Sequence, residues 1–271
     1  MDADNQEWAR LLAPTDAVTR MVMALLRALR EKGVLSEEEL RVLADHSSQE
    51  LVTEEEARTS WHTPWLPTEE LADKVGFRPG MLVLDAGSGF GGPARQIAED
   101  YGCRVIGVDC DPVRVLYAIR QTQRLRLSDQ VSFCWTSFEN LPFPGRLFNV
   151  VWAMESVTRY DTAWLEGVPT GMNPAVFQEF RRVLKSDGRL ACQVWIKAPV
   201  EHADLLRFLE IQGFTLGELD DCTSRWLECM VDSIGNLRDD DPRRESWRKS
   251  HDEMLERGDR VFRFVATPTR E

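Results

Sequence analysis

The stretch that decides the fold is Met81-Leu-Val-Leu-Asp-Ala-Gly-Ser-Gly-Phe-Gly-Gly-Pro-Ala-Arg95. Its apolar first part is typical of a buried strand, and its second part is a glycine-rich turn that opens a helix. Gly87 and Gly89 allow backbone angles that are closed to other residues, and they let a ligand approach the chain. The N–H groups and the positive dipole end of the following helix suit an anionic group. The stretch therefore predicts a ligand-binding turn between a strand and a helix.

The chain around this turn alternates between apolar strand-like runs and helical patterns. Strands are predicted at Met81–Ala86, Arg104–Asp109, Val131–Thr136, Phe148–Ala153, Arg189–Ile196, Phe214–Leu219 and Val261–Ala266. Helical patterns cover 93–101, 112–127, 174–185, 203–212 and a long stretch near 225–258. This alternation predicts a doubly wound α/β fold, with seven mostly parallel strands of which the last is antiparallel. Residues 1–60 are predicted to form an N-terminal helical cap, with a helical hairpin and a polar stretch within 11–58, and residues 61–271 are predicted to form the main domain.

Two ligand classes compete for the glycine turn. Gly87, Gly89 and Gly92 satisfy the GxGxxG pattern of dinucleotide-binding folds, but that pattern alone is weak. Asp85 separates the alternatives, because a carboxylate at the strand tip repels a pyrophosphate and suits a cationic ligand such as S-adenosylmethionine (AdoMet). Asp109 ends the second strand and is positioned to accept hydrogen bonds from ribose hydroxyls in both classes.

Composition and charge restrict the partners. The chain has 271 residues, 43% of them apolar, and a net charge of −12, which disfavours nucleic acids and anionic membrane surfaces. Its six cysteines contain no CxxC pair, so we expect reduced thiols, no metal site and a cytoplasmic protein. The acidic N-terminus is unlike a signal peptide, and no apolar run reaches the ~18 residues of a membrane span. A homodimer is compatible with the helical cap.

Several motifs together resemble one family. Val83–Arg95 and Gly107-Val-Asp109 are similar to class I AdoMet-dependent methyltransferases, as are Glu139-Asn-Leu-Pro-Phe143 and Met154-Glu-Ser156. The stretches Phe180–Leu190 and Val261–Pro268 continue the resemblance, which covers about residues 61–268. Within the class, the likeness is to the small-molecule branch that holds the glycine, sarcosine, dimethylglycine, sterol and tocopherol methyltransferases. The resemblance implies AdoMet as cofactor and methyl transfer to a small-molecule amine, carbon or oxygen by in-line displacement.

The resemblance also assigns cofactor-binding residues. It implies that the methionine end of AdoMet is held by four residues, Asp85, Gly87, Ser88 and Gly89. It places the ribose at Asp109 and the adenine beside Cys110. The acid that usually accepts from the adenine amino group is replaced by Ser137, a departure from the family. Phe138 is expected to pack on the adenine and to offer its backbone N–H.

Candidate catalytic residues are fewer, because methyl transfer mainly needs alignment of the nucleophile and exclusion of water. Glu155 follows the fourth strand and is a candidate base or a group that orients a cationic substrate; a helix cap or rim contact is an equal alternative. Tyr160 lies on the same loop, after Arg159, where the family often has a histidine. His62 is a further candidate, although a lone histidine is more often a packing or surface residue.

The tryptophans fall into two groups by their predicted location. Trp152 and Trp195 fall in strands, whereas Trp61, Trp65, Trp164 and Trp226 fall in loops or at element ends. The second group is expected either to line an apolar or cation-binding pocket or to seal the N-terminal helical cap onto the sheet. The alternatives to methyl transfer are cyclisation or isomerisation on the same fold, an NAD-binding oxidoreductase, and a non-catalytic module that binds a partner.

Overall fold

The computed structural model describes residues 69–158, 172–199, 201–239, 241 and 243–269, with only the backbone at Val113. Its helices are α5 (Glu69–Val75), α6 (Gly92–Tyr101), α7 (Pro112–Arg124), the short 3₁₀ helix η1 (Phe138–Asn140), α8 (Pro174–Val183), α9 (His202–Ile211), α10 (Thr223–Asn236) and α11 (Arg243–Arg257). Its strands are β1 (Leu82–Ala86), β2 (Arg104–Asp109), β3 (Val131–Trp135), β4 (Phe148–Met154), β5 (Leu184–Ile196), β6 (Phe214–Asp221) and β7 (Arg260–Pro268). The predicted N-terminal cap and hairpin lie outside the described residues.

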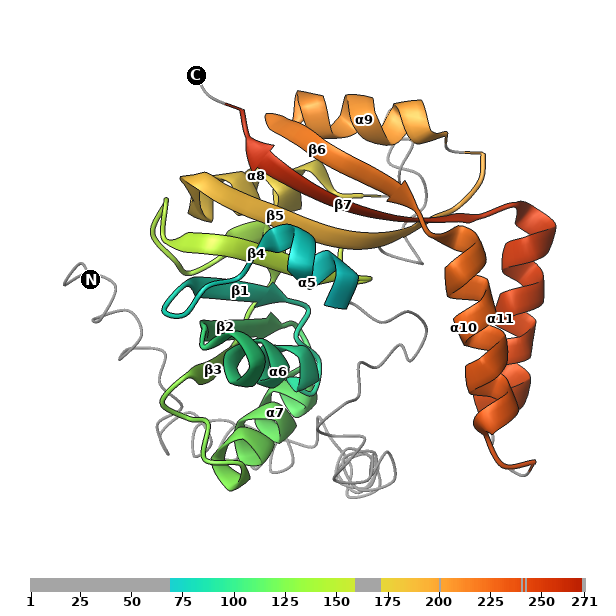
Figure 1. The fold of residues 1–271 in the computed structure, drawn as a ribbon, viewed down its shortest axis with the longest axis horizontal. Coiled ribbons are helices and arrows are strands. Elements are labelled where there is room, and N and C mark those ends of the chain that lie inside the picture. The colour runs from blue at the N-terminus through green and yellow to red at the C-terminus, as the bar shows by residue number, and fades with distance from the viewer. Residues whose placement is uncertain (1–68, 159–171, 200, 240, 242, 270–271) are drawn as a thin grey trace, which may run out of the picture.

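The seven strands form one sheet in the order β3-β2-β1-β4-β5-β7-β6 (Figure 1). The pairs from β3 through β5 are parallel, and β7 runs antiparallel to both of its neighbours. This arrangement confirms the predicted doubly wound sheet with an antiparallel last strand. The carboxyl ends of the parallel strands therefore share one edge, which is where open α/β sheets bind ligands.

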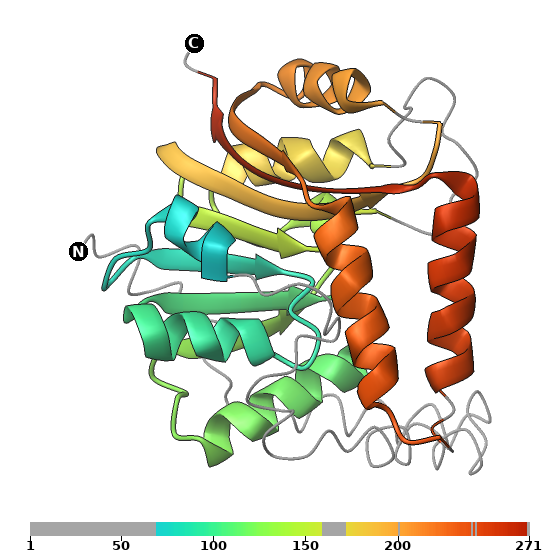
Figure 2. The ribbon, with the colours of Figure 1, turned by 45° about the vertical axis from the view of Figure 1, so that its right-hand side comes forward.

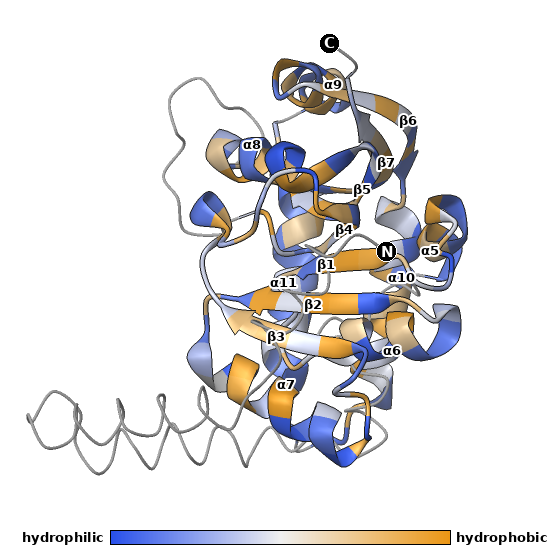
Figure 3. Cartoon of the chain, turned by 90° about the vertical axis from the view of Figure 1, so that its left-hand side faces the viewer, coloured by the Kyte–Doolittle hydropathy of each residue, from blue (hydrophilic) through white to orange (hydrophobic). Residues whose placement is uncertain are grey.

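Helices cover both faces of the sheet. The side chains of α5, α6 and α7 pack on one face in a cluster that includes Leu71, Ile97 and Ile119. The side chains of α8 and α9 pack on the other face, around Phe180 and Leu205. The strands carry apolar residues toward both layers, and Figure 3 shows the orange, hydrophobic stretches along β1 and β2. Burial on both faces explains why the strands appear in the sequence as continuous apolar runs.

A pair of helices, α10 and α11, is inserted between β6 and β7 (Figure 2). A single helical stretch over 225–258 was predicted, and this prediction was wrong because the polar segment Leu237-Arg-Asp-Asp-Asp-Pro242 separates two helices. The pair has its own small apolar cluster, which includes Trp226, Met230 and Met254. Because β6 is antiparallel to β7, the insertion begins at the same sheet edge as the carboxyl ends of β1 and β4.

Other element boundaries moved by a few residues. Strand β5 begins at Leu184 instead of Arg189, and α7 ends at Arg124 because Arg126 adopts a positive φ of 60°. Helix α5, which was not predicted, packs against β5 and β7. All six cysteines are free thiols, as expected.

Candidate functional site

The glycine turn follows β1 and is tied to the neighbouring strand. The backbone N–H groups of Gly87 and Ser88 both donate to the carbonyl of Val108, at 2.8 and 3.0 Å. Gly87 has φ 82° and Gly89 has φ 51°, so both occupy the left-handed region that favours glycine. The conformational role predicted for these two glycines is confirmed.

Asp85 lies at the end of β1 and is 2% exposed. Within the described part of the chain, its Oδ2 atom and the hydroxyl of Ser88 are buried without a hydrogen-bond partner. Burial, together with the charge of Asp109, raises the pKa of Asp85 to about 7, against the opposing effects of the Ala94 N–H and of Arg95. A buried carboxylate in this position is stabilised by a cation, which fits the charge argument made from the sequence.

Asp109 braces the turn from the end of β2. Its Oδ2 accepts from the N–H of Gly89 and its Oδ1 from the N–H of Asp111, both at 2.9 Å. The side chain predicted to contact a ribose therefore also fixes the turn that would hold the other end of the ligand. Each carboxylate oxygen can accept more than one hydrogen bond, so these contacts leave acceptor capacity for hydroxyl groups.

Arg95 on α6 supports the glycine turn, a role that was not predicted from the sequence. It is 1% exposed, and its Nη1 donates to the carbonyl of Phe90 at 2.9 Å. Burial lowers the pKa of Arg95 to about 10, which still leaves the guanidinium charged at neutral pH. The signal for this role was an arginine on the buried side of α6, one residue after Ala94.

The residues assigned to the adenine end gather after β2 and β3. Cys110 is exposed, and its carbonyl accepts from Trp135 Nε1 at 2.9 Å. Ser137 precedes η1, and its hydroxyl donates to the carboxylate of Glu139. Glu139 was not singled out as a site residue, yet it places a carboxylate next to the position where the family's acid is missing.

Phe138 links this end to the glycine turn. Its Cζ atom lies 3.5 Å from the place where a β-carbon would stand at Gly87. Its ring also lies 6.0 Å from that of Phe180 on α8, so the side chain is packed against the core. The structure thus brings Phe138 and the glycine turn together.

Glu155, the first catalytic candidate, follows β4 and is held by protein groups. Its Oε1 accepts from Trp226 Nε1 at 2.8 Å and from the side-chain amide of Gln193. Burial raises the pKa of Glu155, and these two hydrogen bonds with the charge of Arg263 partly oppose that effect. The contact explains the location of Trp226, which is 1% exposed and seals α10 onto the strand ends.

Ser156, the residue after Glu155, packs against the glycine turn. A β-carbon at Gly87 would stand 2.2 Å from Ser156 Cβ, so position 87 needs glycine for space as well as for its backbone angle. The Ser156 hydroxyl donates to the carbonyl of Ala86 at 2.5 Å. The ends of β1 and β4 are therefore in direct contact.

The other candidates lie outside the described residues: His62, Arg159 and Tyr160, and the tryptophans Trp61, Trp65 and Trp164. Over the ranges that are described, no group of three metal-ligating side chains gathers. In the same ranges, none of the helices is both long and apolar enough to cross a membrane.

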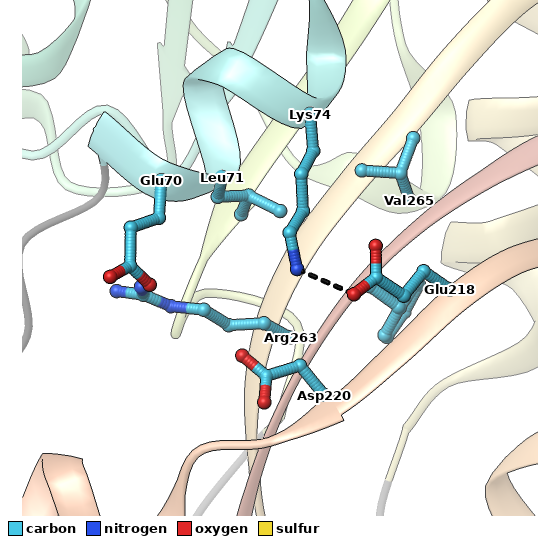
Figure 4. A pocket seen from close by; sticks show the side chains of 8 residues that line it. Glu70, Leu71, Lys74, Glu218, Asp220, Arg263 and Val265 are labelled. Carbon is cyan, nitrogen blue, oxygen red and sulfur yellow. Dashed lines mark hydrogen bonds and ion pairs between the residues drawn. The ribbon is translucent and has the colours of Figure 1, made fainter.

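A pocket lies between α5, β6 and β7 (Figure 4), and none of its lining residues belongs to the glycine turn. Its acidic side chains and Lys74 are engaged in ion pairs. Lys74 Nζ lies 2.8 Å from Glu218 Oε1, and Glu70 and Asp220 both pair with Arg225. These pairs engage the acidic side chains and Lys74, and Arg263 Nε donates to Gln193 Oε1, so the glycine turn is the better candidate for a ligand site.

Comparisons with known proteins test the resemblance to AdoMet-dependent methyltransferases. Residues 83–188 match the family model described as a methyltransferase domain. Sterol 24-C-methyltransferase of Eremothecium gossypii is 37% identical over 126 residues, which are 46% of this chain and 31% of that protein. The corresponding enzyme of Saccharomyces cerevisiae is 36% identical over 46% of this chain and 30% of its own length. The matched region thus spans about a third of these relatives.

Solved structures extend the likeness to most of the chain. The 4+2 cyclase SpnF has a TM-score of 0.62 at 22% identity and covers 75% of this chain and 81% of its own. Geranyl diphosphate C-methyltransferase from Streptomyces coelicolor has a TM-score of 0.61 at 18% identity, over 74% of this chain and 76% of its own. The chain has the class I methyltransferase fold. With the sequence matches, this methyltransferase fold confirms the resemblance to the AdoMet-dependent small-molecule branch.

Proposed function

We propose that this chain binds AdoMet at the glycine turn and transfers its methyl group to a small-molecule acceptor. The observation that carries the proposal is the buried Asp85 carboxylate: among the described residues, neither its Oδ2 atom nor the Ser88 hydroxyl of the following turn has a hydrogen-bond partner. An anionic pyrophosphate would be repelled there by Asp85 and Asp109 together, whereas a cationic methionine end would relieve their repulsion. The match to a methyltransferase domain over the same turn supports the assignment.

The residues of the turn fit the parts of AdoMet. Asp85, Gly87, Ser88 and Gly89 would hold the methionine end, and Asp109 would accept from the ribose. Bound in this way, AdoMet supplies an electrophilic methyl group on a sulfonium centre. The turn would orient that group, and the packed residues around it would exclude water.

The adenine end would be held by the elements after β2 and β3. Cys110 and Phe138 would flank the ring. Ser137 would present a hydroxyl whose charge assistance comes from Glu139, since the two side chains are hydrogen-bonded.

The acceptor is a small molecule with an amine or an activated carbon or oxygen. The names of the relatives, sterol and geranyl diphosphate C-methyltransferases, support carbon among these atoms. Glu155, Tyr160 and His62 stay proposed groups for contact with the acceptor. The free thiols support a reducing, cytoplasmic location, and a homodimer stays a prediction from the sequence.

Calorimetry tests the cofactor. AdoMet or its demethylated product should bind with micromolar affinity, and the double variant Asp85→Ala, Asp109→Ala should lose binding. Binding of NAD(H) without binding of AdoMet would refute the proposal.

Mass spectrometry tests the reaction. A product that gains one methyl group supports transfer, whereas a rearranged product of unchanged mass would identify a cyclase or isomerase, an activity also found on this fold. AdoMet binding without turnover of any amine, phenol or activated carbon, together with a stable complex with another protein, would indicate a non-catalytic module.

A further inference from the structure

Helix α10 reaches the candidate site through one side chain. Trp226 stands in the first turns of α10, 71 residues along the chain from Glu155, and donates its indole N–H to Glu155 Oε1 at 2.8 Å. Its ring lies 5.6 Å from that of Trp195 on β5, within the apolar cluster of the helix pair. The insertion is thereby bonded to the residue that follows β4.

The same carboxylate is held from the sheet as well. Gln193 on β5 donates its side-chain amide N–H to Glu155 Oε1. The backbone carbonyl of Gln193 accepts the backbone N–H of Glu155 at 2.8 Å. Gln193 Oε1 in turn accepts from Arg263 Nε at 2.6 Å, across a register pair of β5 and β7. Arg263 lines the pocket of Figure 4, so a continuous polar chain runs from that pocket to Trp226.

This chain of hydrogen bonds holds Glu155 in an uncommon backbone conformation. Glu155 has φ 51°, in the left-handed region that a side chain such as glutamate seldom adopts. A conformation of this kind persists where surrounding contacts over-determine it, and strain of this kind clusters at functional sites. Glu155 has three such contacts, one on its backbone and two on its carboxylate.

The conformation of Glu155 decides where Ser156 lies. Ser156 Cβ would be 2.2 Å from a β-carbon at Gly87, and its hydroxyl bonds the Ala86 carbonyl. If Glu155 returned to an ordinary φ, the chain after it would turn away and Ser156 would leave the glycine turn. Trp226 and Gln193 thus act on the turn through two intervening residues.

We propose that Trp226 is a positioning residue: its indole N–H, with Gln193, holds Glu155 in the left-handed conformation that keeps Ser156 against Gly87. Through this contact, the inserted helix α10 sets the geometry of the glycine turn. The effect of Trp226 on AdoMet affinity rests on the proposed function, whereas its effect on the Glu155–Ser156 segment does not.

The decisive variant is Trp226→Phe, which keeps an aromatic ring and removes the donor. The matched control is Trp195→Phe, because Trp195 belongs to the same cluster but donates to Asp259 Oδ2 at 3.1 Å instead of to Glu155. Hydrogen exchange of the Glu155 amide, measured without ligand, should become at least tenfold faster in Trp226→Phe and stay within twofold in Trp195→Phe. AdoMet affinity, measured by calorimetry, should fall about tenfold in the first variant only.

A second pair of variants keeps the test decisive if Trp226→Phe does not fold. Glu155→Leu removes the acceptor and should reproduce the fast exchange of the segment, whereas Glu155→Gln retains an acceptor oxygen and should restore slow exchange. Unchanged exchange in both Trp226→Phe and Glu155→Leu would overturn the inference. If the wild-type protein bound no AdoMet, the proposed function would fail, and the exchange rates would still decide the role of Trp226.

Discussion

Two carboxylates stand at neighbouring strand ends, and the structure uses them in opposite ways. At the end of β1, Asp85 keeps an oxygen without a partner inside the described protein. At the end of β4, Glu155 has an oxygen with two side-chain donors. Both are acids at the ligand edge of the sheet, and both have a raised pKa caused first by burial. The difference teaches that the unsatisfied group marks the proposed cofactor site, whereas the satisfied group is held in place by the scaffold.

The strongest test of this contrast is Asp85→Asn. It removes the charge that would attract the cation and should weaken AdoMet binding by about a hundredfold, in line with the 2–5 kcal/mol typical of truncated buried charge pairs. The same change removes a buried charge that the Ala94 N–H and Arg95 compensate only in part, so the melting temperature should stay equal or rise. Calorimetry and thermal unfolding measure the two effects, and a variant that both unfolds earlier and binds normally would contradict the assignment.

The pH dependence of binding sharpens the same contrast. Because Asp85 has a pKa of about 7, its ionised fraction and hence the AdoMet affinity should rise about tenfold between pH 5.5 and 7. Titration calorimetry at several pH values checks this, and the dependence should disappear in Asp85→Asn.

The stability of the unliganded protein should change in the opposite direction. Between the ordinary value of 3.8 and about 7, the folded state binds more protons at Asp85 than the unfolded state. The free energy of unfolding therefore falls as pH rises through this window, relative to Asp85→Asn. A wild-type protein that gained stability over Asp85→Asn from pH 4 to 7 would show that the carboxylate is compensated.

A smaller change than the loss of AdoMet affinity in Asp85→Asn is expected from Asp109→Ala, in the free energy of unfolding. The Asp109 side chain has a structural role besides the proposed ligand binding. Loss of its two charge-assisted hydrogen bonds to the Gly89 and Asp111 N–H groups should lower the free energy of unfolding by about 2 kcal/mol. Removal of its repulsion with Asp85 offsets part of that loss. Urea unfolding measures the change. The control is Asp129→Ala, whose exposed carboxylate should matter by less than about 0.5 kcal/mol.

The smallest changes in AdoMet affinity and in the free energy of unfolding are expected from Glu155→Gln. An amide oxygen still accepts from Trp226, so the affinity for AdoMet should change less than threefold and the free energy of unfolding by less than about 1 kcal/mol. Turnover on an identified acceptor is the further measurement. A hundredfold loss of turnover at unchanged AdoMet affinity would assign the carboxylate to the chemistry and remove the contrast with Asp85.

Local chemistry explains what the sequence could predict. The strand–turn–helix around Asp85 is encoded by neighbouring residues: an apolar run, glycines that require positive φ, and Pro93 in the first helical turn. The alternation of strands and helices likewise predicts the sheet, because each pattern reflects burial of its own side chains.

Long-range contacts explain what it could not predict. The bond between Trp226 and Glu155 joins residues 71 positions apart and depends on where the inserted helices fold back. Both residues were singled out separately, Glu155 as a base and Trp226 as a pocket or sealing residue, but no local pattern connects them. Helix α5 escaped prediction because its seven residues are too few for a clear helical period.

The pairing of β6 with β7 makes the inserted helices a removable module. Asp221 and Phe262 are register partners, and the Cys222 N–H donates to the Val261 carbonyl at 3.0 Å, so the two ends of the insertion are already neighbours in a hairpin. A short turn could replace residues 223–259 and leave the pairs of β7 with β5 and β6 in place, since antiparallel neighbours need no longer connection. Exchanging this segment would keep the sheet but would remove Trp226, so the shape of the glycine turn would then depend on the contact that the new segment makes with Glu155.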